Sequence, residues 1–141
     1  MASNLVVCYD SMQEVVAFDE RLGIGAKYGS TEDYEFFLRV SQHRHFCFLH
    51  DIKIFHPLGY SKKTNMSFKN TIKRIFGYSQ GYIFVLTQNR LFGMISQSVL
   101  KAFLGSFYYL IVKMNVKLFF IHLLVFFYRI WLFFKFILMR K

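Results

Sequence analysis

The chain lacks acidic residues over most of its length. All eight Asp and Glu residues lie at or before Asp51, whereas only four of the eighteen Lys and Arg residues do. Residues 1–51 are therefore acidic and residues 52–141 strongly basic, although the whole chain has a net charge of +10. A charge asymmetry of this kind predicts two parts with different surroundings, a water-facing acidic head and a basic tail.

Cysteine and proline are also scarce. Cys8 and Cys47 stand far apart and form no Cys-x-x-Cys pair, so neither a disulfide framework nor a cysteine zinc site is expected. His43, His45 and His50 lack the further ligands that a structural zinc ion needs. Residues 1–17 have no basic start followed by an apolar core, and we expect no N-terminal signal peptide. The two isolated cysteines favour a reducing compartment.

Apolar and aromatic residues are abundant. The hydrophobic fraction is 55% and the aromatic fraction 21%, with 19 Phe. These values are high for a water-soluble domain and indicate contact with a membrane. A basic excess can also attract nucleic acid, but the tail's cations lie within long Phe, Leu and Ile runs and no nucleic-acid-binding module is visible. We therefore expect a membrane partner and no nucleic acid.

The head alternates short apolar runs with helix signals. Residues 18–30 form a glycine-bearing acidic loop, and residues 31–43 have the periodicity of an amphipathic helix. Ser30 and Thr31 are suitable N-cap residues for that helix. A brief helix is predicted at residues 10–17, and short strands are predicted at residues 3–9, 46–49 and 52–56.

The tail has three long helical segments. Residues 66–89 combine an apolar side with a basic side carrying Lys69 and Lys73, as in a helix at a membrane interface. Gly77 and Gly81, four residues apart, either permit close helix packing or are simply tolerated. Two apolar runs follow, at residues 91–112 and 118–139, interrupted by charges such as Lys101, Arg129 and Lys135. They predict either a membrane hairpin, which we favour, or two interfacial helices whose Lys and Arg reach the headgroups.

The stretch from Phe18 to Arg39 contains the pattern Phe-Asp-Glu-Arg-Leu-Gly-x-Gly…Tyr-Gly-Ser-x-Glu-Asp-x-Glu-Phe-x-x-Arg. This pattern resembles the second half of the catalytic domain of family 2 glycosyltransferases, which have the GT-A fold. The likeness extends to residues 3–7 before it and to Ile54-Phe55-His56-Pro57 after it. It implies an α/β fragment, a partial GT-A domain at residues 1–59, followed by a basic amphipathic linker helix at 60–90 and a membrane-associated helical hairpin at 91–141.

The resemblance also implies roles for particular residues. Asp33 would be the catalytic base that takes the proton from the acceptor hydroxyl, with Glu32 beside it to orient the acceptor or share the charge. His56 would lie near a divalent metal, Mn or Mg, that stabilises the departing nucleotide diphosphate. Arg39 is expected to form an ion pair within the head. The substrates implied are a nucleotide sugar and a glycan or lipid-linked acceptor, at the cell membrane with the catalytic part facing the cytoplasm.

No Asp-x-Asp motif and no glycine-rich phosphate turn after a strand occur in the sequence. In the family that the chain resembles, such elements belong to the N-terminal half that binds the nucleotide sugar. We therefore expect a C-terminal part of a glycosyltransferase that is inactive alone, either from a truncated or split reading frame or as one part of a two-chain enzyme with a separate N-terminal half. The alternative is a small basic membrane protein with a scaffolding role in polysaccharide synthesis and no catalysis.

Overall fold

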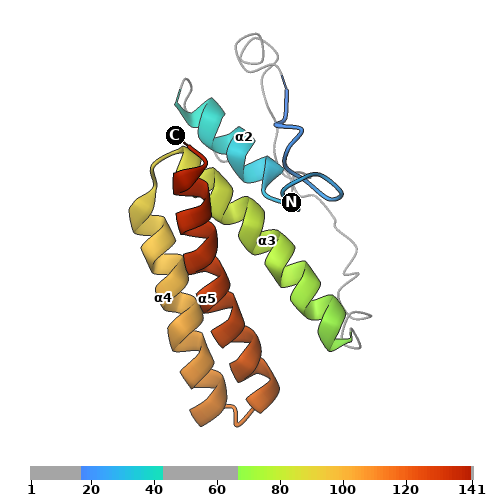
Figure 1. Cartoon of the computed structure of the whole chain (residues 1–141), viewed down its shortest axis with the longest axis vertical. Helices are drawn as coiled ribbons and strands as arrows, with labels where there is room; N and C mark the ends of the chain where they lie inside the picture. The colour runs from blue at the N-terminus through green and yellow to red at the C-terminus, as the bar shows by residue number, and fades with distance from the viewer. Residues whose placement is uncertain (1–16, 43–66, 141) are drawn as a thin grey trace, which may run out of the picture.

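The computed structural model of the chain describes residues 17–42 and 67–140. Helices make up 74% of these residues. In chain order they are α2 (Glu32–Ser41), α3 (Phe68–Gln88), α4 (Phe92–Ile111) and α5 (Val116–Leu138). α4 and α5 form an antiparallel hairpin, α3 lies beside α5, and α2 lies across the end of the bundle where α3 finishes (Figure 1).

The predicted fold class, an α/β fragment of a GT-A domain, is wrong for the part of the chain that is described. Four helices and no strand are found there, and the only β-type pairing in these residues is an isolated bridge between Leu22 and Tyr28. The α/β prediction relied on short apolar runs that lie outside the described residues. The described apolar runs are far longer than a strand and have helical periodicity, so they form a bundle instead.

Side-chain caps define where two of the tail helices start. The Ser67 hydroxyl accepts a hydrogen bond from the backbone N–H of Asn70, 3.3 Å away, at the beginning of α3. Asn115 acts in the same way at α5, accepting from the N–H of Leu118 at 3.0 Å. Each cap satisfies a backbone donor that has no partner inside its helix. The turn between α4 and α5 is thereby fixed at Val112–Asn115.

The main core lies where the three tail helices meet. Its fully or nearly fully buried side chains come from all three, and they include Ile83, Leu86, Ile95, Leu132 and Phe136. Phe76 of α3 also stacks on Tyr128 of α5, with ring centroids 4.2 Å apart. Burial of each such side chain contributes roughly 1.5–3 kcal/mol, so packing rather than charge holds the bundle together.

Small residues let α4 and α5 approach closely. Ala102 and Ser106 of α4 are buried in the hairpin. At Gly105 a Cβ atom would come within 3.0 Å of His122 Nδ1. The imidazole of His122 therefore occupies the space that a side chain at residue 105 would need, and it packs against Tyr109 with ring centroids 4.8 Å apart.

The loop before α2 docks onto α3 and α5. The Tyr28 ring stacks on Phe84 of α3 at 4.1 Å and meets Phe136 of α5 edge-on at 5.4 Å. Gly29 approaches Gly77 so closely that a Cβ on Gly29 would lie 3.2 Å from the Gly77 Cα. Gly77 and Gly81 therefore allow the loop to approach α3. The sequence had suggested either close packing between helices or glycines that are simply tolerated, and neither alternative included this contact.

α5 is long and apolar enough to cross a membrane. Only 22% of its most apolar window is buried inside the protein. The core helix of a water-soluble protein would be mostly buried, so the outward-facing apolar surface of α5 favours membrane association. Among the described helices, it is the one that meets this test.

We expect Gly81→Ala to weaken the docking of the head on α3. A Cβ at this position would collide with the Ser30 carbonyl group and come within 2.8 Å of Thr31 Oγ1. The predicted loss is roughly 1–2 kcal/mol, because the collision exceeds the helix-propensity gain of alanine. Thermal unfolding of the detergent-solubilised chain and limited proteolysis of residues 17–42 measure the effect.

Gly93→Ala is the matched control, since a Cβ there meets nothing within 4 Å. It should raise the stability by up to about 1 kcal/mol, as alanine does in an open helical position. If both substitutions stabilised the chain equally, the close contact at Gly81 would be contradicted.

Candidate functional site

The two candidate catalytic acids lie at the start of α2. Glu32 and Asp33 occupy its first turn together with Glu35, and all three are half-buried. Carboxylates at this position are stabilised by the positive end of the helix dipole. Asp33 is neither sealed in an apolar core nor fully exposed.

The predicted cap of α2 is only partly correct. Thr31 is the N-cap residue, but it has a left-handed backbone (φ 85°) and its side chain makes no capping hydrogen bond. Its hydroxyl instead lies 3.0 Å from the hydroxyl of Ser30. Ser30 is buried and donates a 3.5 Å hydrogen bond to the Tyr78 carbonyl of α3. Both hydroxyls therefore hold the helix start against α3.

The acidic loop folds back over the first turn of α2. The Glu32 carboxyl group lies against Gly23, where an added Cβ would be 3.6 Å from Glu32 Cδ. Gly23 has φ 117°, a conformation that favours glycine, and its N–H donates to the Tyr28 carbonyl at 3.0 Å. The loop conformation thus helps to fix the position of the Glu32 carboxyl group.

A tyrosine pair joins α2 to α3, and no local pattern in the sequence indicates this contact. The ring of Tyr34, next to Asp33 in the chain, packs against Tyr82 of α3 with centroids 5.9 Å apart. The Tyr34 hydroxyl donates to the sulfur of Met94 at 3.5 Å, and burial raises the pKa of this phenol.

Arg39 forms the ion pair that was predicted for it. Its guanidinium donates two 2.9 Å hydrogen bonds to the two oxygens of Glu35, one helical turn earlier. A third bond, 2.7 Å long, reaches the carbonyl of Ala17. Arg39 therefore ties α2 to the beginning of the loop.

A second ion pair stabilises the loop itself. Arg21 donates to both carboxyl oxygens of Asp19, at 2.9 and 2.7 Å, and its guanidinium lies 5.1 Å from the centre of the Phe84 ring. The hydrogen bonds from Arg21 lower the pKa of the Asp19 carboxyl group. Asp19 in turn raises the pKa of Arg21.

The proposed metal ligand, His56, lies outside the described residues, as do His43, His45 and His50. Within residues 17–42 and 67–140, no group of three or more His, Cys, Asp or Glu side chains could hold a metal ion. The prediction of a divalent metal near His56 stays a prediction.

Arg129 does not lie on the outside of α5, where the interfacial-helix alternative would have it reach the headgroups. It turns into the bundle and donates to the Ser98 carbonyl of α4 at 2.7 Å and to the Ser79 hydroxyl of α3 at 3.3 Å. This side chain therefore links all three tail helices. A sequence pattern cannot show this, because its partners lie 31 and 50 residues away.

We expect the Asp19–Arg21 pair to make the stability of the chain depend on pH. Because the folded state lowers the pKa of Asp19, its contribution is present at neutral pH and is lost as the pH falls below about 4. Asp19→Asn should lower the unfolding temperature at pH 7 by an amount equivalent to no more than about 1 kcal/mol, and by less at pH 3. Glu20→Gln, at an exposed neighbouring acid, is the control. The difference in unfolding temperature between this variant and the native chain should not become smaller from pH 7 to pH 3.

Comparison of the chain with protein families, with characterised proteins and with solved structures found no match in any of the three. The function proposed below is argued from the residues of this chain and from their arrangement.

Proposed function

We propose that the chain carries the proton-accepting part of a membrane-associated glycosyltransferase, which moves a sugar from a nucleotide sugar to a glycan or lipid-linked acceptor. The observation that carries this proposal is the Glu32–Asp33 pair on the first turn of α2, within the run of residues that resembles family 2 glycosyltransferases. The apolar outer surface of α5 supports a location at a membrane.

The chemistry assigned to Asp33 is general base catalysis. As the acceptor oxygen bonds to the anomeric carbon, its proton passes to the Asp33 carboxylate. The bond between the anomeric carbon and the diphosphate oxygen breaks, and the nucleoside diphosphate leaves with the electron pair. A divalent ion, Mn or Mg, near His56 would stabilise the charge that develops on this leaving group.

The surroundings of the acid pair suit this role. A base must touch the acceptor, and Asp33 is half-exposed on a helix that is held at both ends. Ser30 and Thr31 fix its first turn against α3, while Arg39, near the other end of α2, donates to the Ala17 carbonyl of the loop. A base held by packing keeps its geometry as the substrate changes.

The cell membrane, with α2 on the cytoplasmic side, is the location that fits these features. Nucleotide sugars are available in the cytoplasm, and two cysteines that stand far apart in the sequence fit a reducing compartment. A separate N-terminal half would hold the donor sugar. The competing hypothesis, a basic membrane scaffold for polysaccharide synthesis, makes no use of Asp33.

Asp33→Asn should abolish sugar transfer. We expect a fall of 10²-fold or more, the usual range for loss of a general base. The measurement is incorporation of labelled sugar from a panel of nucleotide sugars into the lipid and glycan fractions of membranes. The membranes are taken from cells that normally make the protein, with each variant replacing the native chain. Any separate N-terminal half is then present as well.

Glu20→Gln is the matched control, an exposed acid of the same loop that lies outside the first turn of α2. It should retain normal transfer, while Glu32→Gln should show an intermediate loss. Equal transfer by Asp33→Asn and the native chain would refute the catalytic proposal and favour the scaffold.

A further inference from the structure

The charged head lies beside one end of the bundle. Tyr28 contacts Phe84 and Phe136, and the Tyr34 hydroxyl reaches Met94, so the head touches α3, α4 and α5. If the head is in water, the final turns of α5 lie at the level of the aqueous phase. The remainder, from Val116 to Trp131, spans about 24 Å at 1.5 Å per residue, less than the ~30 Å of a hydrocarbon core.

The opposite end of the bundle holds the start of α3 and the hairpin turn together. The Lys117 ammonium group lies 5.7 Å from the centre of the Phe68 ring. Residues 43–66 connect α2 to α3, and in sequence they include Arg44, Asp51 and Lys53 and no apolar run of eighteen residues. In sequence this stretch lacks the run of about 20 apolar residues that a spanning helix needs. The sequence therefore favours both ends of the bundle lying on the same side of the membrane.

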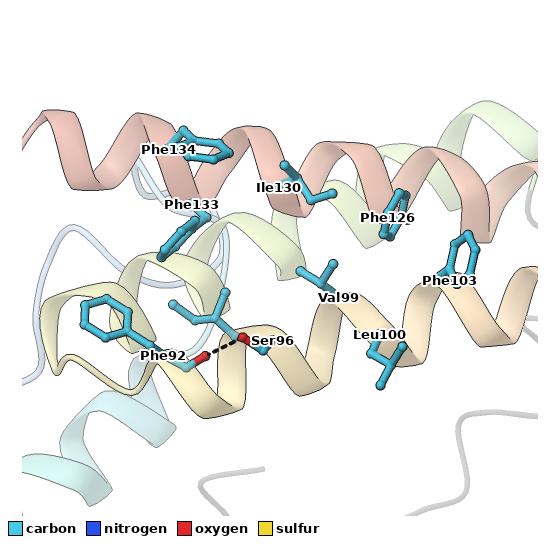
Figure 2. Close-up of a pocket in the computed structure, with 10 residues that line it drawn as sticks. Phe92, Ser96, Val99, Leu100, Phe103, Phe126, Ile130, Phe133 and Phe134 are labelled. Carbon is cyan, nitrogen blue, oxygen red and sulfur yellow. Dashed lines mark hydrogen bonds between the residues drawn. The ribbon is translucent and has the colours of Figure 1, made fainter.

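One face of the hairpin is apolar along its whole length. On α5 a stripe of large apolar side chains recurs every three or four residues, each between 45% and 67% exposed: Phe120, Leu124, Phe127, Trp131, Phe134 and Leu138. Beside it, a groove of about 420 Å³ runs between α4 and α5 (Figure 2). Every residue lining the groove comes from these two helices, so it opens away from α3 and the head.

The groove offers nothing to a polar ligand. Of its lining residues only Ser96 is polar, and its hydroxyl already donates to the Phe92 carbonyl of its own helix at 3.1 Å (Figure 2). The charges around the apolar face have one sign, because residues 67–140 contain no acid. Lys101, Lys113 and Lys117 are exposed. An exposed apolar face on a bundle whose only charges are cations fits lipid chains carrying anionic headgroups.

We propose that the α4–α5 hairpin lies flat in one leaflet of an anionic membrane instead of crossing it. The stripe on α5 and the groove beside it face the acyl chains, the lysines meet the headgroups, and α3 with the head stays on the water side. This inference rests on the proposed membrane association and not on the catalytic role of Asp33.

Tryptophan scanning along the stripe tests the depth of α5. Trp131 is the chain's single tryptophan, so Phe120→Trp, Phe127→Trp and Phe134→Trp are each made together with Trp131→Phe. The full-length chain is inserted into vesicles of phosphatidylcholine and phosphatidylglycerol, and quenching by lipids brominated at known positions gives each depth. A flat helix places all three at one shallow depth. A spanning helix would bury residue 127 about 10 Å deeper than the other two, and that result would overturn the proposal.

Cysteine labelling tests the side on which the turn lies. In a chain carrying Cys8→Ser and Cys47→Ser, Met114→Cys reports on the turn, where Met114 is 84% exposed, and Ile24→Cys reports on the head, where Ile24 is 94% exposed. With an impermeant maleimide, both should react from the same face of sealed membrane vesicles. Reaction of Met114→Cys only from the opposite face, or only after detergent is added, would overturn the proposal. Sugar transfer is not measured, so either result leaves the test of Asp33 independent.

Discussion

The close contact between the turn at residues 28–31 and the glycine face of α3 determines where the acid-bearing helix sits. At Gly81 the backbone of the turn occupies the space that any side chain would fill, and Tyr28 enters between α3 and α5. Contacts of this kind depend on shape, and a single added methyl group disturbs them. The acid pair on α2 is therefore placed by steric fit, since the loop that precedes it has no freedom to turn elsewhere on this surface.

The charged side chains of the head and of the bundle contact different kinds of partner. In the head, Asp19 and Glu35 each pair with a nearby arginine. The bundle has no acid, and its cations use other partners. Arg129 donates to oxygens of Ser79 and Ser98, and Arg140 donates to the Thr87 carbonyl. Lys135 lies 4.8 Å from the centre of the Trp131 ring. These neutral partners stabilise the cations without cancelling their charge, so the bundle keeps a positive potential toward its surroundings.

The helices could be predicted from the sequence because helical periodicity is a local property. The segments expected at residues 66–89 and 91–112 are found as Phe68–Gln88 and Phe92–Ile111, and the one expected at 31–43 as Glu32–Ser41. The position of the acid pair on a first turn follows from the same local pattern.

Contacts between distant residues could not be predicted. The sequence does not show that Gly81 faces Ser30, that Tyr34 meets Tyr82, or that Arg129 points inward. Each of these depends on how whole helices pack, and a charged residue in an apolar helix has the same sequence signature whether it faces lipid or the bundle. The α/β fold class failed for another reason: it depended on short apolar runs that lie outside the described residues, and among the described residues only helices are found.

A hairpin that lies flat would keep Asp33 a short distance from a lipid-linked acceptor. The helix start carrying Asp33 rests on α3, α3 packs on α5, and the stripe of α5 that would meet lipid faces outward. Packed helix axes lie about 8–10 Å apart, so one or two such layers separate the acid pair from the acyl chains. A hydroxyl carried on a lipid headgroup could then approach Asp33 while its chain remains in the leaflet. In a spanning arrangement this distance would depend on how far the bundle protrudes, whereas in a flat one the thickness of the helices sets it.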